Sequence, residues 1–259
     1  MLYVRDYMNL NINFIFILLI FTLASFNIFI SACMAEEIRL SSVSGLNGVI
    51  EILCDNYIQK NRGVKIVRDY AAAGNIANQL ESGEKIDIVI ILSSRTTDIL
   101  IGKDLLDRRS INRFATNRLV VVAQNDHKLT SIQDLANLER IAVGDPAIVA
   151  SGEYAYQAIN RAGLEKELKN RIIKTRDNRE SLYLVRSGKT DGAIINKSDL
   201  KYSGLDIKSI EIPNTLYPRI TYIVALTSHG KNEKNVVTFH RYLQSDEVRK
   251  ILSKYDLAI

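Results

Sequence analysis

The sequence predicts an α/β protein with mostly parallel sheets, and three patterns carry that prediction. From residue 38 onward, short apolar stretches alternate with stretches whose apolar residues recur at helical spacing. Residues 86–92 (IDIVIIL) are continuously apolar, as expected for a strand in the middle of a parallel sheet. At three junctions a strand is followed by small residues and then by the start of a helix. Such junctions meet at the carboxyl ends of parallel strands, where α/β proteins bind ligands.

The expected elements follow one another closely along the chain. Strands are expected at residues 38–43, 64–71, 86–92, 117–124, 141–143, 171–175, 192–195 and 217–226. Helices are expected after residue 44 and at residues 76–84, 97–106, 131–138, 151–162, 179–186, 236–243 and 246–255. No linker-like segment interrupts the alternation, so the pattern alone leaves one lobe or two open.

The first junction places Ser44 between a strand and a helix. In this helix Leu46, Val49 and Ile50 recur at helical spacing. A serine at this place is either an N-cap, whose oxygen accepts from an N–H inside the helix, or a hydroxyl donor to a bound oxyanion. Cys54 falls on the apolar side of the same helix and is expected to be a core residue.

The other two junctions repeat this arrangement. Residues 64–71 (VKIVRDYA) lead into Ala72 and Ala73, small residues that let the backbone approach a ligand closely. Residues 140–155 (RIAVGDPAIVASGEYA) read as a strand, a Gly-Asp-Pro turn and a helix that starts at Ser151. A helix start offers unpaired backbone N–H groups to an anion. An ordinary strand-to-helix connection is the alternative interpretation.

The charge distribution does not favour a nucleic-acid partner. The 259 residues carry a formal net charge of +5. Lysines such as Lys60, Lys103 and Lys169 are scattered along the chain, and few stand beside aromatic residues. We expect them to form a solvated surface that attracts anions weakly.

The N-terminal segment is expected to direct export. Residues 14–30 are strongly apolar and uncharged, and small residues follow them. Residues 1–35 therefore read as a signal peptide, with an uncleaved membrane anchor as the alternative. The tetrapeptide ending at Cys33 (ISAC) resembles a bacterial lipobox, whose cysteine would be lipidated; cleavage after Ala35 is the other possibility. Either way the folded part is expected in the periplasm or outside the cell.

The chain offers little for catalysis, so no enzyme, no cofactor and no metal cation is expected. His127, His229 and His240 fall in a loop, a turn and a terminal helix, away from any candidate nucleophile. No metal-ligand spacing and no Gly-x-Ser-x-Gly elbow occurs. Asp145 is the only carboxylate expected near the junctions, and a single carboxylate without a partner is a poor acid–base catalyst. An enzyme or a sensor stays the less favoured alternative.

Four segments together resemble the molybdate-binding proteins of ABC transporters, over the whole chain from Ile38 onward. They are residues 140–155, residues 117–124, residues 79–83 with Asp87, and the pair Tyr217-Pro218. The resemblance implies a class II periplasmic-binding-protein fold, in which two α/β lobes are joined by crossing strands, here 117–124 and 218–226. The implied division puts residues 36–118 and 222–259 in lobe 1 and residues 119–221 in lobe 2.

The resemblance also implies a ligand site between the lobes. The family's binding positions fall on Ser44, Ala73, Ser151, Asn178 and Asn196. A family serine is lost at Ala73, and a family tyrosine is replaced by Asn196. The implied ligand is molybdate or tungstate, the implied partner is a membrane permease of an ABC transporter, and a monomer is expected.

Other anions stay open as ligands of such a cleft, namely sulfate, phosphate or a small organic anion. A fully ionised oxyanion has no proton to donate, so its site needs donors and no carboxylate. A protonated phosphate would instead want a carboxylate, such as Asp145 or Asp177, facing inward. Arg176 and Arg179 are expected at the rim, where they either pair with the anion or bridge to Asp177 and Glu180.

Overall fold

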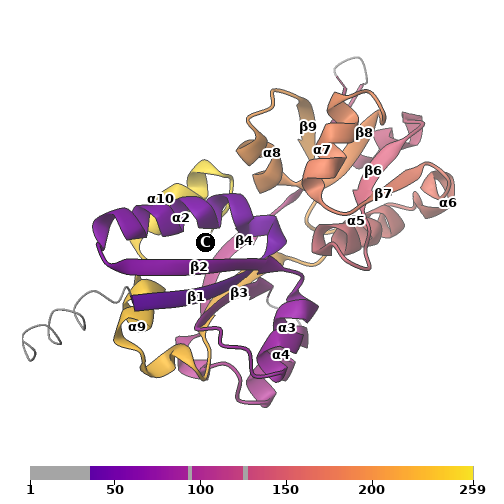
Figure 1. Ribbon diagram of the computed structural model, residues 1–259. Helices are drawn as coiled ribbons and strands as arrows, with labels where there is room; N and C mark the ends of the chain where they lie inside the picture. The colour runs from indigo at the N-terminus through magenta and orange to yellow at the C-terminus, as the bar shows by residue number, and fades with distance from the viewer. Residues whose placement is uncertain (1–35, 93–94, 125–127, 259) are drawn as a thin grey trace, which may run out of the picture.

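The computed structural model describes residues 36–92, 95–124 and 128–258 (Figure 1). These residues form two α/β lobes, each with its own five-stranded sheet, so the predicted two-lobe α/β class is confirmed. The expected signal peptide, residues 1–35 with Cys33, lies outside the described residues. Within the described ranges, every helix is too short or too polar to cross a membrane.

Lobe 1 is built on the sheet with strand order β2-β1-β3-β10-β4. Strand β10 is antiparallel to both neighbours, so the other four strands share one direction. In sheet order the strands are β2 (Val64–Ala71), β1 (Glu36–Val43), β3 (Ile88–Leu92), β10 (Ile220–Leu226) and β4 (Asn112–Asn117). The helices of this lobe are α2 (Asn47–Lys60), α3 (Ala73–Glu81), α4 (Arg95–Gly102), α9 (Lys234–Tyr242) and α10 (Asp246–Lys254).

Lobe 2 is built on the sheet with strand order β7-β6-β8-β5-β9. Here β5 is the strand that runs antiparallel to both neighbours. In sheet order the strands are β7 (Ile172–Thr175), β6 (Ile141–Gly144), β8 (Gly192–Asn196), β5 (Leu119–Ala123) and β9 (Lys208–Glu211). The helices are α5 (Ala150–Arg161), α6 (Glu165–Leu168), α7 (Asn178–Arg186) and α8 (Lys197–Ser203).

The reversed strand in each sheet is the one that follows a crossing between the lobes. The chain leaves lobe 1 along β4 and enters lobe 2 along β5, with Arg118 as the single residue between them. It returns through residues 212–219 into β10. A strand that enters a lobe from the cleft runs away from the cleft, whereas the strands that precede the βα junctions run towards it. The sheets are therefore mixed rather than uniformly parallel.

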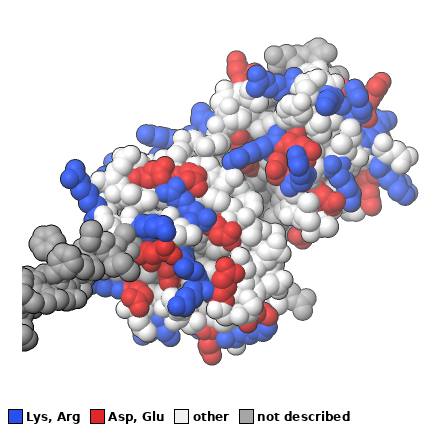
Figure 2. Space-filling view, viewed as in Figure 1, with Lys and Arg blue, Asp and Glu red and all other residues white. Residues whose placement is uncertain are grey.

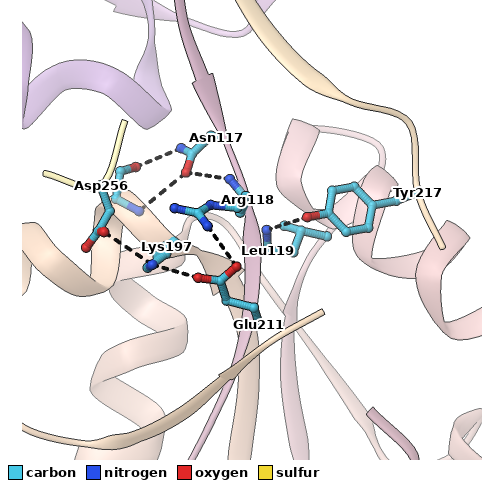
Figure 3. A network of polar contacts seen from close by, with 8 residues as sticks. Asn117, Arg118, Leu119, Lys197, Glu211, Tyr217 and Asp256 are labelled. Carbon is cyan, nitrogen blue, oxygen red and sulfur yellow. Dashed lines mark hydrogen bonds and ion pairs between the residues drawn. The ribbon is translucent and has the colours of Figure 1, made fainter. Parts of the chain in front are cut away.

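Several polar contacts hold the crossing in place (Figure 3). The amide nitrogen of Asn117 donates to the Ser198 hydroxyl at 2.8 Å, and the backbone N–H of Leu119 donates to the Tyr217 hydroxyl at 3.0 Å. Lys197, at the start of α8, pairs with Glu211 at 2.7 Å and with Asp256 after α10 at 3.2 Å. The start of α8 is thereby tied to both lobes.

Some expected elements differ in the structure. The stretch 117–124 is split, because Asn117 belongs to β4 and Leu119 begins β5. The helix expected at residues 131–138 is the 3₁₀ helix η3 (Ile132–Asn137), and the helix expected at 97–106 is α4, which ends at Gly102. Strands β4 and β9 and helices α6 and α8 are additional elements. Strand β9 (KSIE) is short, largely exposed and at a sheet edge, so no apolar pattern marks it.

Candidate functional site

A cavity of about 180 Å³ lies between the two lobes. That volume suits a ligand of a few heavy atoms rather than a drug-sized molecule, whose pockets are about 300–1,000 Å³. Residues at the starts of helices from both lobes line it. All five positions predicted as ligand positions are among the lining residues: Ser44, Ala73, Ser151, Asn178 and Asn196.

The βα junctions converge on this cavity as the parallel strands require. Helices α3, α5 and α7 begin at residues that line it, and so does the 3₁₀ helix η1 (Ser44–Leu46), which leads into α2. Within the described ranges, the backbone N–H groups of Ala73, Ser151 and Asn178 have no hydrogen-bond acceptor. The start of a helix carries a partial positive charge, so these groups favour an anion in the cavity.

Ser44 acts differently from an N-cap. The capping position of η1 is Val43, and no side chain caps this helix. Ser44 is exposed, lines the cavity, and its hydroxyl makes no hydrogen bond to any other described residue. The N-cap interpretation of Ser44 is therefore wrong, and the hydroxyl is free to donate to a ligand.

Ala73 contributes its backbone and an open space. It is the first residue of α3, and the capping residue before it is Ala72, which also lines the cavity. Neither side chain carries a polar group. The junction therefore leaves its N–H groups accessible and adds no side-chain donor.

The three polar positions from lobe 2 form a chain of hydrogen bonds that ends at Asp199. The Ser151 hydroxyl donates to Asn178 Oδ1 at 2.9 Å. Asn178 Nδ2 donates to Asp199 Oδ2 at 2.6 Å, and Asn196 Nδ2 donates to the same oxygen at 3.1 Å. Ser151, Asn178 and Asn196 are 5%, 6% and 4% exposed. The two asparagine amides are thus directed at a carboxylate of the protein itself, and the Ser151 hydroxyl is directed at Asn178.

Asp199 is a site residue that the sequence analysis does not identify. It lines the cavity from the first turn of α8, three residues after Asn196. Burial raises the pKa of its carboxyl to about 6, although the Asn178 and Asn196 amides and the Arg179 charge act against that rise. The spacing N-x-x-D at the end of a strand is a signal that would have marked it, because it places an acid on the first helical turn facing the capping residue.

The cavity also holds an unpaired acceptor. Asn196 Oδ1 is buried and has no hydrogen-bond partner among the described residues. Two tyrosines line the cavity nearby, Tyr154 and Tyr222, and burial raises the pKa of each. Both hydroxyls therefore stay protonated at neutral pH, and each can donate or accept a hydrogen bond.

The acidic residues are not where they were expected. Asp145 is absent from the cavity lining and pairs with Lys174 at 3.3 Å. Asp177 lines the cavity, but its side chain accepts from the N–H of Glu180 and caps α7. The expectation that Asp145 is the only carboxylate near the site is wrong, because Asp177 and Asp199 both line it.

The two rim arginines behave differently from each other. Arg176 pairs with Glu180 at 3.3 Å, which is the expected bridge to an acidic neighbour. Arg179 instead donates to Asn47 Oδ1 at 2.6 Å. Since Asn47 begins α2 in lobe 1, this bond spans the mouth of the cleft. Both arginines line the cavity, so their charges add to the attraction for an anion.

The described histidines lie elsewhere. His229 contacts the buried Asp87 at 2.8 Å, and Asp87 also accepts from the backbone of Arg39. Burial lowers the pKa of His240, and His127 lies outside the described residues. In the ranges that the structure describes, no group of three or more His, Cys, Asp or Glu side chains could hold a metal ion. On the face shown in Figure 2, basic and acidic side chains are interspersed over both lobes.

Comparison with known proteins identifies a family and several relatives of this chain. The model of the bacterial extracellular solute-binding protein family matches residues 38–256. The molybdate-binding protein ModA of Escherichia coli is 27% identical over 237 residues, which is 87% of this chain and 91% of that protein. ModA of Haemophilus influenzae is 26% identical over 234 residues, 87% and 91% of the two chains. The periplasmic molybdate-binding protein of Azotobacter vinelandii superposes with a TM-score of 0.76 at 15% identity, covering 86% of this chain and 99% of that one.

Proposed function

The chain belongs to the bacterial extracellular solute-binding proteins, and from this membership we propose that it captures a small tetrahedral oxyanion, molybdate or tungstate, and delivers it to the permease of an ABC transporter. Its family is named for solute binding, and one sequence relative is named as a putative ABC transporter substrate-binding lipoprotein, which supports a binding role without catalysis. We further propose that the segment 1–35 directs export, ending either in lipidation of Cys33 or in cleavage after Ala35, and that the exported protein is a monomer.

One observation carries the proposal for an oxyanion. Helix starts from both lobes meet at one small cavity, and the N–H groups of Ala73, Ser151 and Asn178 are unpaired there. A hydroxyl from Ser44 and two arginines at the rim add further donors. A ligand that accepts on all sides satisfies these groups at once, and a tetrahedral oxyanion is such a ligand.

Molybdate comes first among the oxyanions because two sequence relatives whose matches cover 87% of this chain are named for binding it. Hydrogen phosphate is the second candidate, and one observation favours it. Asp199 lines the cavity as an acceptor, and a phosphate that still carries a proton has a donor to offer it. Sulfate has no such donor and ranks below phosphate on this geometry.

A thermal-shift panel tests the proposal. The purified protein is heated with molybdate, tungstate, sulfate, phosphate or chloride, at matched ionic strength. A ligand at a thousand times its Kd adds about 4 kcal/mol of stability, which is a rise in Tm of roughly 10 °C for a chain of this size. A rise with molybdate and tungstate alone supports the first candidate, and a rise with phosphate alone supports the second. No rise with any of the four oxyanions contradicts an oxyanion site.

A further inference from the structure

Asp199 occupies a place in the cavity that a bound anion would compete for. Its Oδ2 accepts hydrogen bonds from the side-chain amides of Asn178 and Asn196, two of the positions implied to bind the ligand. No described residue donates to its Oδ1. The carboxylate and an incoming dianion would therefore bring two like charges into one small cavity.

The surroundings of Asp199 do not neutralise that repulsion. Asn178 and Asn196 are neutral amides, and Lys197 on the same helix is engaged by Glu211 and Asp256. The positive charge of Arg179 stabilises the ionised Asp199 carboxylate and the negative charge of Asp177 destabilises it, so these two charges oppose each other. The charged and titratable groups around Asp199 are Arg179 on α7, Arg176 and Asp177 just before α7, Tyr222 on β10, Tyr154 on α5, Tyr202 and Lys197 on α8, and Tyr255 after α10.

We propose that anion binding in this cavity is coupled to one proton held between Asp199 and the ligand. A fully ionised oxyanion binds with uptake of a proton by Asp199, whereas hydrogen phosphate brings the proton itself. Protonated Asp199 donates a hydrogen bond to the anion through Oδ1, while Oδ2 still accepts hydrogen bonds from the Asn178 and Asn196 amides. The buried Asn196 Oδ1, which lacks a donor among the described residues, is a second acceptor for a proton-bearing ligand. This inference rests on the proposed oxyanion site.

The direction of the pH effect follows from linkage. Burial already raises the pKa of free Asp199 to about 6, and a bound dianion raises it further. Between the two pKa values the complex holds more protons than the free protein, so binding takes up a proton. In this interval the affinity for molybdate falls about tenfold for each unit by which the pH rises.

Calorimetric titration of the purified protein with sodium molybdate tests the coupling without any variant. Titrations at pH 7.5 in two buffers that differ in ionisation enthalpy measure the protons taken up. We expect close to one proton per molybdate, and close to none when the titrant is phosphate. Molybdate binding without proton uptake, at an affinity independent of pH from 6.5 to 8.5, overturns the inference.

Asp199→Asn separates the coupling from a structural role. Its amide oxygen can accept from Asn178 and Asn196 while its NH₂ group faces the cavity, so at pH 8 we expect this variant to bind molybdate tighter than the wild type by up to about a hundredfold. We also expect the pH slope and the proton uptake to vanish. If the Asp199 carboxylate only positions the two asparagines, the opposite result is expected: the variant binds molybdate more weakly, and the dependence of its affinity on pH is unchanged.

Asp145→Asn is the matched control. This carboxylate lies outside the cavity lining, and its pKa is lowered by the Ala147 N–H and Lys174, so it stays ionised over the whole range. We expect the molybdate affinity of this variant to change with pH as it does in the wild type. If neither molybdate nor phosphate binds at any pH, the oxyanion site itself is refuted, which is a different result from binding without proton uptake.

Discussion

Gly152→Ala tests how the start of α5 is held at the cavity. A methyl group at position 152 would lie 2.1 Å from the carbonyl oxygen of Gly144 and 2.6 Å from its carbonyl carbon. These are backbone atoms at the end of β6, a strand paired on both sides by β7 and β8. The strand cannot move aside without disturbing both neighbours, so α5 must shift instead.

The size of the effect follows from that contact. Overpacking in a close-packed interior costs about 1–3 kcal/mol, and a backbone obstacle places this substitution at the upper end. For a chain of this length, about 3 kcal/mol lowers Tm by roughly 6–12 °C. A shifted α5 also misplaces the N–H of Ser151, and the loss of one hydrogen bond to a charged ligand weakens binding roughly ten- to a hundredfold.

Gly74→Ala is the matched control on another helix at the same cavity. A methyl group at position 74 meets nothing within 4 Å, and the residue lies inside α3. We expect a gain of about 0.5–1 kcal/mol because alanine is the better helix former. Both variants are compared by chemical denaturation and by titration with the oxyanion that stabilises the wild type. Wild-type stability and affinity in Gly152→Ala would refute the reasoning, as would equal destabilisation in Gly74→Ala.

Three further outcomes are expected. Ser44→Ala should weaken oxyanion binding roughly ten- to a hundredfold without lowering Tm, because the hydroxyl bonds to no described residue and is free for the ligand; a drop in Tm with unchanged affinity would contradict this. Tyr217→Phe should destabilise the protein by about 1–3 kcal/mol in urea, because the buried N–H of Leu119 loses its acceptor; an unchanged midpoint would show that another group replaces the hydroxyl. Cys54 should resist thiol reagents at pH 8 until the protein unfolds, since it is fully buried and burial raises its pKa to about 12; rapid labelling of the folded protein would contradict its place in the core.

Local patterns were sufficient for much of the fold. The apolar run at 86–92 predicts a central strand, and β3 lies inside the lobe 1 sheet with every residue buried. The three junctions predict a ligand site at the carboxyl ends of strands, and the predicted positions line one cavity. Such signals succeed because hydrophobic periodicity and small residues act within a few positions of the chain.

The break between β4 and β5 at Arg118 shows what local sequence patterns cannot predict. Residues 117–124 are apolar enough to read as one strand, yet Asn117 pairs within lobe 1 and Leu119 within lobe 2. Which sheet a strand joins depends on partners that lie far away in the sequence. The same holds for the reversed strands β5 and β10, whose direction is set by entry from the cleft.

The site, too, was predicted in part from the sequence and decided in part by the tertiary structure. By itself the sequence determined an α/β chain whose strand ends carry small and polar residues, and it identified Ser44, Ala73 and Ser151 as candidates. Only the tertiary structure decided which groups are free. It directs Asn178 and Asn196 at Asp199 and leaves the Ser44 hydroxyl open. The physical reason is that a donor binds whichever acceptor the fold places within hydrogen-bond distance of it, and for Asn178 on α7 that acceptor lies on a different helix, α8.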